Sequence, residues 1–199
     1  MKDNSRIRLI AAEVMWLLLV FAVTLSLAPA DSSAAPQRDK RPVSAQAQER
    51  LERVVGHELR MLPYYSVFDN FEYRVKGYDV ELMGQVTRPT LKTDAERVVK
   101  RIEGVEKVTN RIEVLPLSPN DDRIRRAVFR AIYSNSFLTR YALQAVPPVH
   151  IIVKNGHVTL VGVVATESES NVATIQANSV PGVFSVTNRL RPEKTGQKS

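Results

Sequence analysis

The sequence predicts an α+β fold made of two tandem domains that follow an N-terminal signal segment. Three observations support this fold: an internal repeat, a change of apolar periodicity within each repeat, and an uncharged apolar stretch near the N-terminus. The composition, with 44% hydrophobic and 25% charged residues in a chain of 199, is that of a globular protein. The absence of cysteine excludes disulfides, thiol nucleophiles, thiolate zinc sites and a thioether-linked lipid anchor.

Residues 1–30 have the layout of a bacterial export signal. Three basic side chains precede an uncharged apolar stretch over residues 14–28, and a small-x-small cleavage motif ends at Ala30. A basic region, an apolar region of about 7–15 residues and such a motif are what export and cleavage require. We therefore expect a periplasmic protein whose signal peptide is cleaved near Ala30.

A retained inner-membrane anchor over residues 9–28 is the alternative, because about 20 apolar residues span a bilayer. Glu13 lies inside this longer segment and argues against it. Beyond the leader, residues 31–46 are rich in Ser, Ala, Pro, Gln and charge and are expected to form a flexible linker. Residues 193–199 are expected to be a disordered tail.

Between these ends the chain contains two copies of one sequence unit, and we predict them to form domains 47–116 and 120–192. A shift of 78 positions aligns residues 75–112 with residues 153–190 without a gap, and 13 of these 38 pairs are identical. Upstream the shift is 73, so the second copy has about five extra residues between its first helix and its first strand.

Each copy is predicted to open with an amphipathic helix and to continue with a β-hairpin. Apolar residues recur at helical spacing over residues 51–62 and 124–132. Asp121 and Asp122 are at the expected N-cap of the second of these helices. Residues 71–86 and 149–164 alternate with period two, as strands do, and Asn155-Gly156 is typical of a tight hairpin turn.

A second helix and a third strand complete each predicted unit. Pro89 suits the first turn of a helix that runs to about Glu103. In the second copy, Thr166 and Glu169 form a capping-box pattern. The third strands are expected within residues 105–114 and 183–190, so each copy forms a small mixed three-stranded sheet covered by two helices.

The repeated motifs resemble the BON domain. They are Leu-Met-Gly-Gln-Val at 82–86, Leu-Val-Gly-Val-Val at 160–164, and Gly-Val-x-x-Val-Thr-Asn-Arg at 104–111 and 182–189. Two such domains behind an export signal resemble osmotically induced periplasmic proteins and dual-BON envelope proteins of Gram-negative bacteria. The resemblance implies a non-enzymatic role: association with phospholipid membranes, envelope integrity under stress such as osmotic shock and, in some members, a chaperone-like role.

The four motif glycines are interpreted as structural residues. Gly84 and Gly162 interrupt strands, where glycine typically marks a bulge or a close approach by another segment. Gly104 and Gly182 are expected at helix C-caps that need a positive φ.

The net charge of +7 is unevenly distributed. Residues 47–116 hold 12 basic and 12 acidic side chains, whereas residues 120–192 hold 8 basic and 4 acidic ones, a net +4. On a helical wheel Arg123, Arg126 and Arg130 form one stripe, with Phe129 and Tyr133 beside it and away from the buried face.

Partly exposed rings beside arginines are typical of a contact with anionic lipid headgroups, and we expect Phe137, Leu138, Arg140 and Tyr141 to extend this patch. The alternative is that Phe129 and Tyr133 pack against the other domain.

Catalytic motifs are absent from the sequence. Of the three histidines, only His150 and His157, on opposite arms of the second predicted hairpin, could form a metal pair, and this signal is weak. We therefore expect no enzyme activity, no cofactor and no metal. An exported protein is also not expected to bind nucleic acid. The predicted function is weak, salt-dependent association with anionic phospholipid membranes. The alternatives are a periplasmic protein-binding or chaperone-like module and a membrane-tethered accessory of an envelope assembly.

Overall fold

The computed structural model describes residues 44–193, and both copies of the repeat have the predicted order of elements. The predictions for the leader and most of the linker and tail lie outside these residues. The first copy consists of α2 (Ala45–Arg60), β1 (Asn70–Lys76), β2 (Asp79–Val86), α3 (Pro89–Lys100), β3 (Lys107–Asn110) and β4 (Glu113–Val114). The second consists of α4 (Pro119–Tyr133), the 3-10 helix η1 (Thr139–Leu143), β5 (Val149–Lys154), β6 (His157–Val164), α5 (Glu167–Asn178) and β7 (Ser185–Pro192).

The two sheets share one topology and one register. In each, an antiparallel hairpin is followed by a third strand that is parallel to the second hairpin strand. Tyr73 pairs with Leu82, and Ile151 pairs with Leu160, as the shift of 78 requires. In the first copy the predicted third strand is interrupted between β3 and β4, and both pieces pair with β2.

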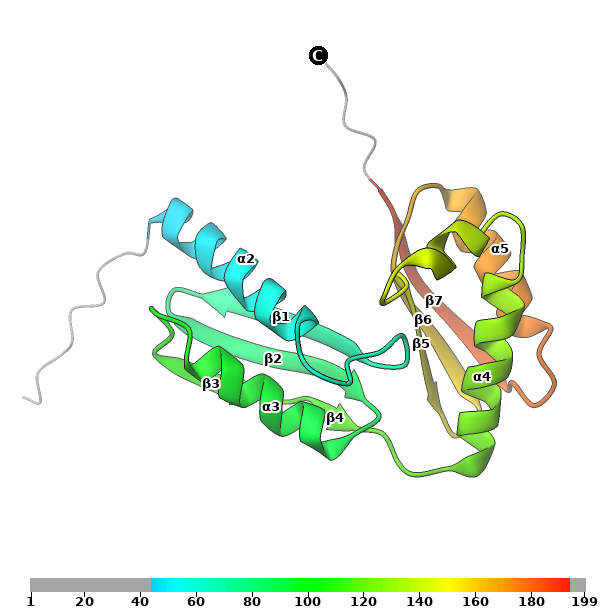
Figure 1. Cartoon of the computed structure of the whole chain (residues 1–199), viewed down its shortest axis with the longest axis horizontal. Helices are drawn as coiled ribbons and strands as arrows, with labels where there is room; N and C mark the ends of the chain where they lie inside the picture. The colour runs from blue at the N-terminus through cyan, green and yellow to red at the C-terminus, as the bar shows by residue number, and fades with distance from the viewer. Residues whose placement is uncertain (1–43, 194–199) are drawn as a thin grey trace, which may run out of the picture. The chain divides into compact units, whose positions relative to one another are not determined.

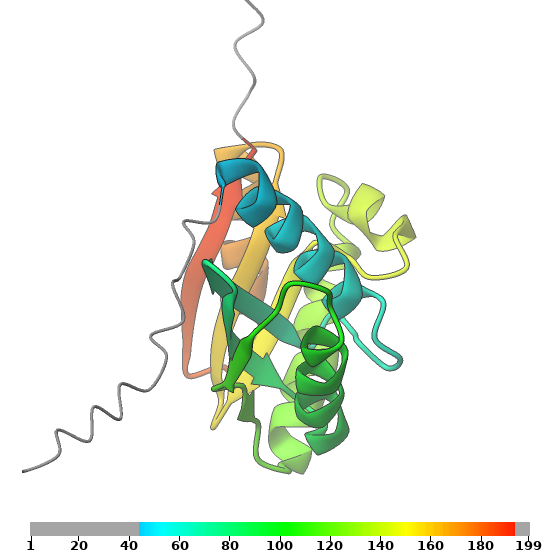
Figure 2. The ribbon, with the colours of Figure 1, turned by 90° about the vertical axis from the view of Figure 1, so that its left-hand side faces the viewer.

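Two helices cover one face of each sheet (Figure 1). Figure 2 shows the second sheet, in which β6 lies between β5 and β7. The resulting core of each copy is apolar and almost fully buried. The first centres on Leu82, Leu91 and Ile112, and the second on Ile124, Ile132 and Leu160.

The loop between α2 and β1 belongs to the first copy but packs against the second. Val67 is 7% exposed and lies in the second core, and its carbonyl accepts a hydrogen bond of 2.8 Å from the Ile151 amide. Phe68 packs edge-on against Phe129 of α4, with 6.1 Å between the ring centroids. The Nζ of Lys154 also pairs with Glu113 at 2.5 Å. The two copies therefore share apolar and polar contacts.

Several predicted helix ends are corrected. The N-cap of α4 is Ser118, whose hydroxyl accepts from the Asp121 amide, so neither Asp121 nor Asp122 is the cap. The capping box of α5 at Thr166 and Glu169 is present as predicted. Helices α3 and α5 end at Arg101 and Ser179 as C-caps, which places Gly104 and Gly182 three residues further on. Both glycines have a φ of +92°, but in the turn that leads to the third strand.

Gly84 and Gly162 lie where another segment approaches the strand backbone. A Cβ at Gly162 would be 1.8 Å from the carbonyl oxygen of Pro148, and one at Gly84 would be 2.1 Å from that of Asn70. Both residues also have a positive φ, which L-residues rarely adopt. A side chain at either position would therefore displace the first hairpin strand.

Candidate functional site

All three predicted arginines of α4 are exposed, but they differ in their hydrogen-bond partners. Arg126 and Arg130 are exposed, and neither lies within ion-pair distance of a carboxylate in residues 44–193. Arg123 is also exposed, but its guanidinium donates to the Asn120 side chain at 3.0 Å and to the Pro181 carbonyl at 3.5 Å. Arg126 and Arg130 are therefore the α4 cations that remain available to an anionic ligand.

The predicted partial exposure of the aromatic pair beside this stripe is wrong for Tyr133 and holds for Phe129. Tyr133 is 5% exposed, and its hydroxyl donates to the Val149 carbonyl at 2.8 Å. Burial raises the pKa of Tyr133 well above its ordinary value. Phe129 is half-buried between Phe68 and Tyr133. For Phe129 the alternative of packing against the other domain therefore holds, because the α2–β1 loop covers the ring that the helical wheel left open.

The residues predicted to extend the patch mostly have structural roles. Leu138 is fully buried in the second core, because the chain turns back beneath α4 after its last turn. The Tyr141 hydroxyl donates to Glu169 at 2.8 Å and accepts from the Ala165 amide. Arg140 forms an ion pair with the same Glu169 carboxylate.

Phe137 differs from its neighbours because it is 67% exposed. Of the nine predicted contact residues, only Arg126, Arg130 and Phe137 are both exposed and without a polar or packing role in the described part of the chain.

A hollow of about 370 Å³ lies beside Arg126, and we call it the α4 hollow. It is lined by the first half of α4, by the linker between the copies, by Thr87 and Arg88 just before α3, and by Phe68 of the α2–β1 loop. Arg88 and Arg126 line it, and Leu117 in the linker is 95% exposed at its edge. The Asp122 carboxylate in its wall is paired with Arg125. Arg88 and Arg126 are therefore available to bind an anion beside the exposed side chain of Leu117.

Tyr64 adds an aromatic ring to this surface. It is 71% exposed, and the Arg88 guanidinium lies 4.9 Å from the centre of its ring. Sequence reasoning missed Tyr64, Arg88 and Leu117, because they belong to the neutral copy and to the linker. The linker between β4 and α4 reads Leu-Pro-Leu-Ser, and no local signal in it distinguishes the exposed Leu117 from the buried Leu115.

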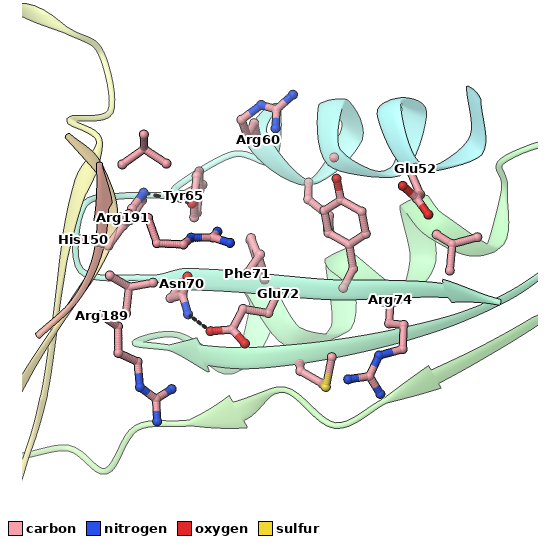
Figure 3. A pocket seen from close by; sticks show the side chains of 18 residues that line it. Glu52, Arg60, Tyr65, Asn70, Phe71, Glu72, Arg74, His150, Arg189 and Arg191 are labelled. Atoms are coloured by element: carbon pink, nitrogen blue, oxygen red, sulfur yellow. Dashed lines mark hydrogen bonds between the residues drawn. The ribbon is translucent and has the colours of Figure 1, made fainter. Parts of the chain in front are cut away.

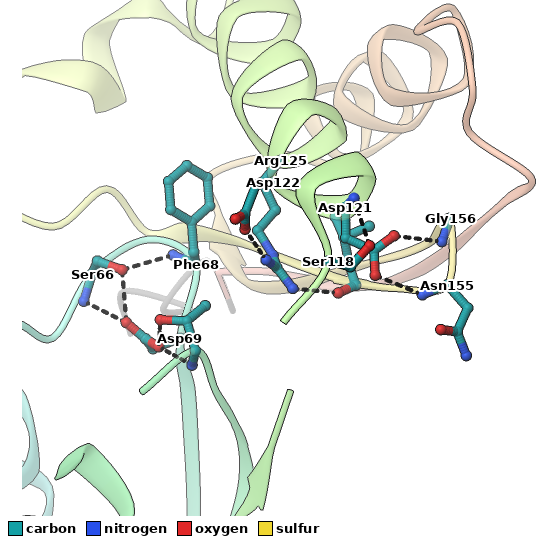
Figure 4. Close-up of polar contacts among 11 residues, drawn as sticks. Ser66, Phe68, Asp69, Ser118, Asp121, Asp122, Arg125, Asn155 and Gly156 are labelled. Carbon is teal, nitrogen blue, oxygen red and sulfur yellow. Dashed lines mark hydrogen bonds and ion pairs between the residues drawn. The ribbon is translucent and has the colours of Figure 1, made fainter. Parts of the chain in front are cut away.

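Two buried carboxylates hold the elements around the α4 hollow in place (Figure 4). Asp69 accepts from the amide and hydroxyl of both Ser66 and Thr87, which fixes the loop that carries Val67 and Phe68. Asp121 accepts from the amides of Asn155 and Gly156, each at 2.9 Å, which ties the first turn of α4 to the hairpin turn. Such charge-assisted bonds are stronger than neutral ones, so they set the position of α4.

The part of the chain that the structure describes offers no metal site: no three His, Asp or Glu side chains converge as ligands there. His150 and His157 lie near opposite ends of the β5–β6 hairpin, since His157 pairs with Lys154 and His150 with Val161. Between residues 44 and 193, no helix has the length and hydrophobicity needed to cross a bilayer.

Comparison with known proteins identifies both copies. The sequence model of the BON domain matches residues 45–116 and 120–192. No curated protein matches the chain. Two solved structures are similar: CdsD, a structural protein of the type III secretion system of Chlamydia trachomatis, and the C-terminal domain of CdsD. The first is 13% identical, covers 74% of this chain and 95% of the chain in that structure, and has a TM-score of 0.29. The second is 11% identical, covers 70% and 96%, and has a TM-score of 0.26.

Proposed function

Because the chain belongs to the BON-domain family over both of its copies, we propose that it associates reversibly with anionic phospholipid through the surface around the α4 hollow. Tandem BON domains are typical of envelope and membrane-associated proteins, and the domain is a non-catalytic module. We extend this to a periplasmic protein, released by cleavage near Ala30, that has no enzyme activity and supports envelope integrity under stress. The lipid contact consists of Arg88, Arg126 and Arg130 together with Tyr64 and Leu117.

One observation carries this proposal: exposed arginines without carboxylate partners, among residues 44–193, lie beside exposed apolar side chains. A guanidinium binds phosphate oxygens with two parallel hydrogen bonds. Leu117 and Tyr64 can enter the boundary between headgroups and acyl chains. Each cation near an anionic leaflet contributes about 1 kcal/mol, so three support weak binding that salt weakens further.

Co-sedimentation with phosphatidylglycerol vesicles tests the proposal. The protein is the chain from Asp31 onward, which retains every core residue, since the two cores lie between Leu51 and Leu190. We expect binding at low salt that weakens steadily as sodium chloride is added, and no binding to phosphatidylcholine vesicles. The Arg126→Glu, Arg130→Glu double variant is expected to lose most of this binding, because it reverses both exposed charges.

The first copy provides the matched control. Arg50 and Arg53 of α2 correspond to Arg123 and Arg126 and are also exposed, so the Arg50→Glu, Arg53→Glu variant changes the net charge by the same amount. We expect this control to keep most of its vesicle binding. Equal losses in the two variants would mean that net charge alone drives adsorption, and that the α4 surface is not the site.

Leu117→Ser tests the apolar part of the contact, because Leu117 lies outside both cores. We expect this variant to weaken binding at high salt more than at low salt, since insertion of an apolar side chain is not screened. The intact mass of the exported protein tests the localisation: a mass without residues 1–30 supports release into the periplasm. A mass that includes them would favour the tethered alternative.

A further inference from the structure

The edge strand of the first sheet has backbone groups that point out of the sheet. The Arg111 amide donates to the Leu82 carbonyl at 2.8 Å, so the backbone of Leu82 faces the third strand. Tyr73 is paired with Leu82, and its own amide and carbonyl therefore face the open edge. The same holds for Phe71 and Val75, which are two residues away in each direction.

In the second copy, three of the six backbone groups of Val149, Ile151 and Val153 that face the edge have partners within the described residues. The Val149 carbonyl accepts from the Tyr133 hydroxyl, the Ile151 amide donates to the Val67 carbonyl, and the Val153 carbonyl accepts from Arg125. The α2–β1 loop thus already lies along this edge and places an apolar side chain in the core beneath it.

In the first copy only one of the three equivalent groups has a partner within residues 44–193. The Val75 carbonyl accepts from the Gln48 side chain at 3.4 Å. No hydrogen bond in the described chain reaches the Phe71 carbonyl or the Tyr73 amide. In α2, Arg60 corresponds to Tyr133 of α4, and Gly56 corresponds to Phe129. The first copy therefore lacks the aromatic side chains that lie at this edge of the second sheet.

A cavity of about 920 Å³, which we call the β1 cavity, lies along this edge (Figure 3). Six successive residues of β1, from Asn70 to Val75, line it, together with Gly56 and Leu59 of α2. Its opposite side is the outer face of β6 and β7, with Val161 and Val163 beside Arg189 and Arg191. Figure 3 shows the Arg191 side chain reaching from the second sheet into the space beside β1.

We propose that the β1 cavity binds an extended peptide segment of a partner protein, which adds to the β1 edge as a further strand. The segment alternates acidic and apolar side chains. This site is independent of the lipid surface, because the β1 cavity and the α4 hollow share no lining residue.

Backbone pairing supplies the extended conformation. An exposed row of unpaired amides and carbonyls is a template for strand addition, and main-chain hydrogen bonds hold peptides that bind in this way. The second copy shows the same edge position occupied by a segment whose Val67 is buried. In the first copy the Tyr73 side chain fills the position beside Gly56, where a Cβ would lie 2.5 Å from the Tyr73 hydroxyl, so an apolar side chain of the added strand meets this ring.

The charge of the lining sets the chemistry of the partner. The charged lining is mainly basic, with four arginines and two glutamates: Arg60, Arg74, Arg189, Arg191, Glu52 and Glu72. Arg74 is paired with Glu81, but Arg189 and Arg191 are exposed and have no carboxylate within ion-pair distance in the described residues. Successive side chains of a strand point to opposite sides. In a strand that lies in the cavity, every second side chain therefore points toward α2, and the side chains between them point toward Arg189 and Arg191.

The test uses a fluorescein-labelled heptapeptide of alternating valine and glutamate, which matches β1 in length. Fluorescence anisotropy with the chain from Asp31 onward is expected to show saturable binding. The alternating valine–lysine peptide and the acidic peptide with N-methylated valines are expected not to bind. The first reverses the charge, and the second removes main-chain donors. NMR is expected to show slowed exchange of the Tyr73 amide on peptide addition.

A pair of charge variants locates the site. We expect the Arg189→Glu, Arg191→Glu variant to bind the acidic peptide about tenfold more weakly or worse, since two charge-assisted contacts are lost. The Arg101→Glu, Lys107→Glu variant makes the same charge change at two exposed positions outside the cavity and is expected to bind normally. Both are expected to bind phosphatidylglycerol vesicles equally, so failure of this proposal is distinguished from failure of the lipid proposal.

Three results would overturn the proposal. The first is that the acidic peptide shows no saturable binding to the unmodified protein. The second is that the two charge variants lose the same affinity. The third is that the peptide protects or shifts amides elsewhere while the Tyr73 amide exchanges as before.

Discussion

The two copies have the same strand register but use their first helix and their first strand differently. In the second copy Asp121, Arg125 and Tyr133 of α4 all bond to the β5–β6 hairpin. In the first copy Gln48 makes the one such bond from the α2 side chains to β1 in the described structure. The second hairpin is therefore closed by its helix and by the α2–β1 loop, whereas the first hairpin keeps an open edge.

This difference separates two kinds of surface. The closed copy leaves its charges on the outside of α4, where Arg126 and Arg130 are exposed. The neutral copy leaves backbone groups at β1, where Phe71 and Tyr73 face a cavity. A duplicated fold can thus diverge in function through the few side chains that close or leave open one sheet edge, while all apolar positions keep their spacing.

The largest expected effect comes from a charge placed in the shared contact of the copies. Val67→Asp puts a carboxylate into the second core, where Val67 is 7% exposed. An unpaired buried charge costs about 3–5 kcal/mol, and we expect the free energy of unfolding in urea to fall by an amount of this order. The corresponding residue of the second copy is Ala145, which is exposed, and Ala145→Asp is expected to have little effect. Equal effects of the two substitutions would show that the α2–β1 loop does not pack into the second core.

A smaller effect is expected from the helix side chain that reaches the hairpin. Asp121→Ala leaves the amides of Asn155 and Gly156 without their acceptor, and Asp121 is 1% exposed. Each unsatisfied buried group costs about 1–3 kcal/mol, so we expect a loss of about 2–4 kcal/mol in unfolding free energy.

Gln48 is the equivalent residue of the first copy, and its bond to Val75 is long at 3.4 Å. Gln48→Ala is therefore expected to cost about 0.5 kcal/mol. Similar losses of unfolding free energy in Asp121→Ala and Gln48→Ala, measured by urea unfolding, would contradict the proposed difference between the two hairpins.

The fold could be predicted from the sequence because its signals are local and occur twice. Period-two alternation predicted the strands, helical spacing predicted the helices, and Asn155-Gly156 predicted the hairpin turn. In the structure both turn residues have a positive φ. Helix ends were less accurate. The residues that cap α4 and close α3 and α5 depend on the turn geometry around them, which a residue type alone does not specify.

Of the candidate surface, only the charges on α4 could be predicted. Arg126 and Arg130 lie where the helical wheel places them, since the charged face of a helix is set by spacing. Tyr133 does not, because a nearby carbonyl at Val149 receives its hydroxyl and draws the ring inward. Tyr64 and Leu117 come from other parts of the chain, and no periodicity within α4 contains information about them.

The smallest expected effect is a pH dependence of the contact between the copies. His150 stacks on Tyr65 of the α2–β1 loop, with 5.6 Å between the ring centroids. Burial lowers the pKa of His150, although the nearby Asp69 carboxylate acts in the opposite direction, and burial raises the pKa of Tyr65 to about 12. Tyr65 thus stays neutral over the range tested. As the pH falls below about 6.5, the ordinary pKa of histidine, the unfolded chain takes up a proton that folded His150 resists.

This contribution to stability is therefore complete above the ordinary pKa of histidine and is lost as the pH falls through the lowered pKa of the folded protein. We expect urea unfolding at about pH 7.5, 6 and 5 to show a decline in the unfolding free energy that is shallower in His150→Phe, which keeps the stacked ring but cannot titrate. His157→Phe is the control, because His157 is exposed on β6 and should leave the decline unchanged. The first copy has Glu72 at the position of His150, so this sensitivity belongs to the second hairpin alone. The same pH slope in the His150→Phe variant and the unmodified protein would show that the loss of stability at low pH does not come from His150.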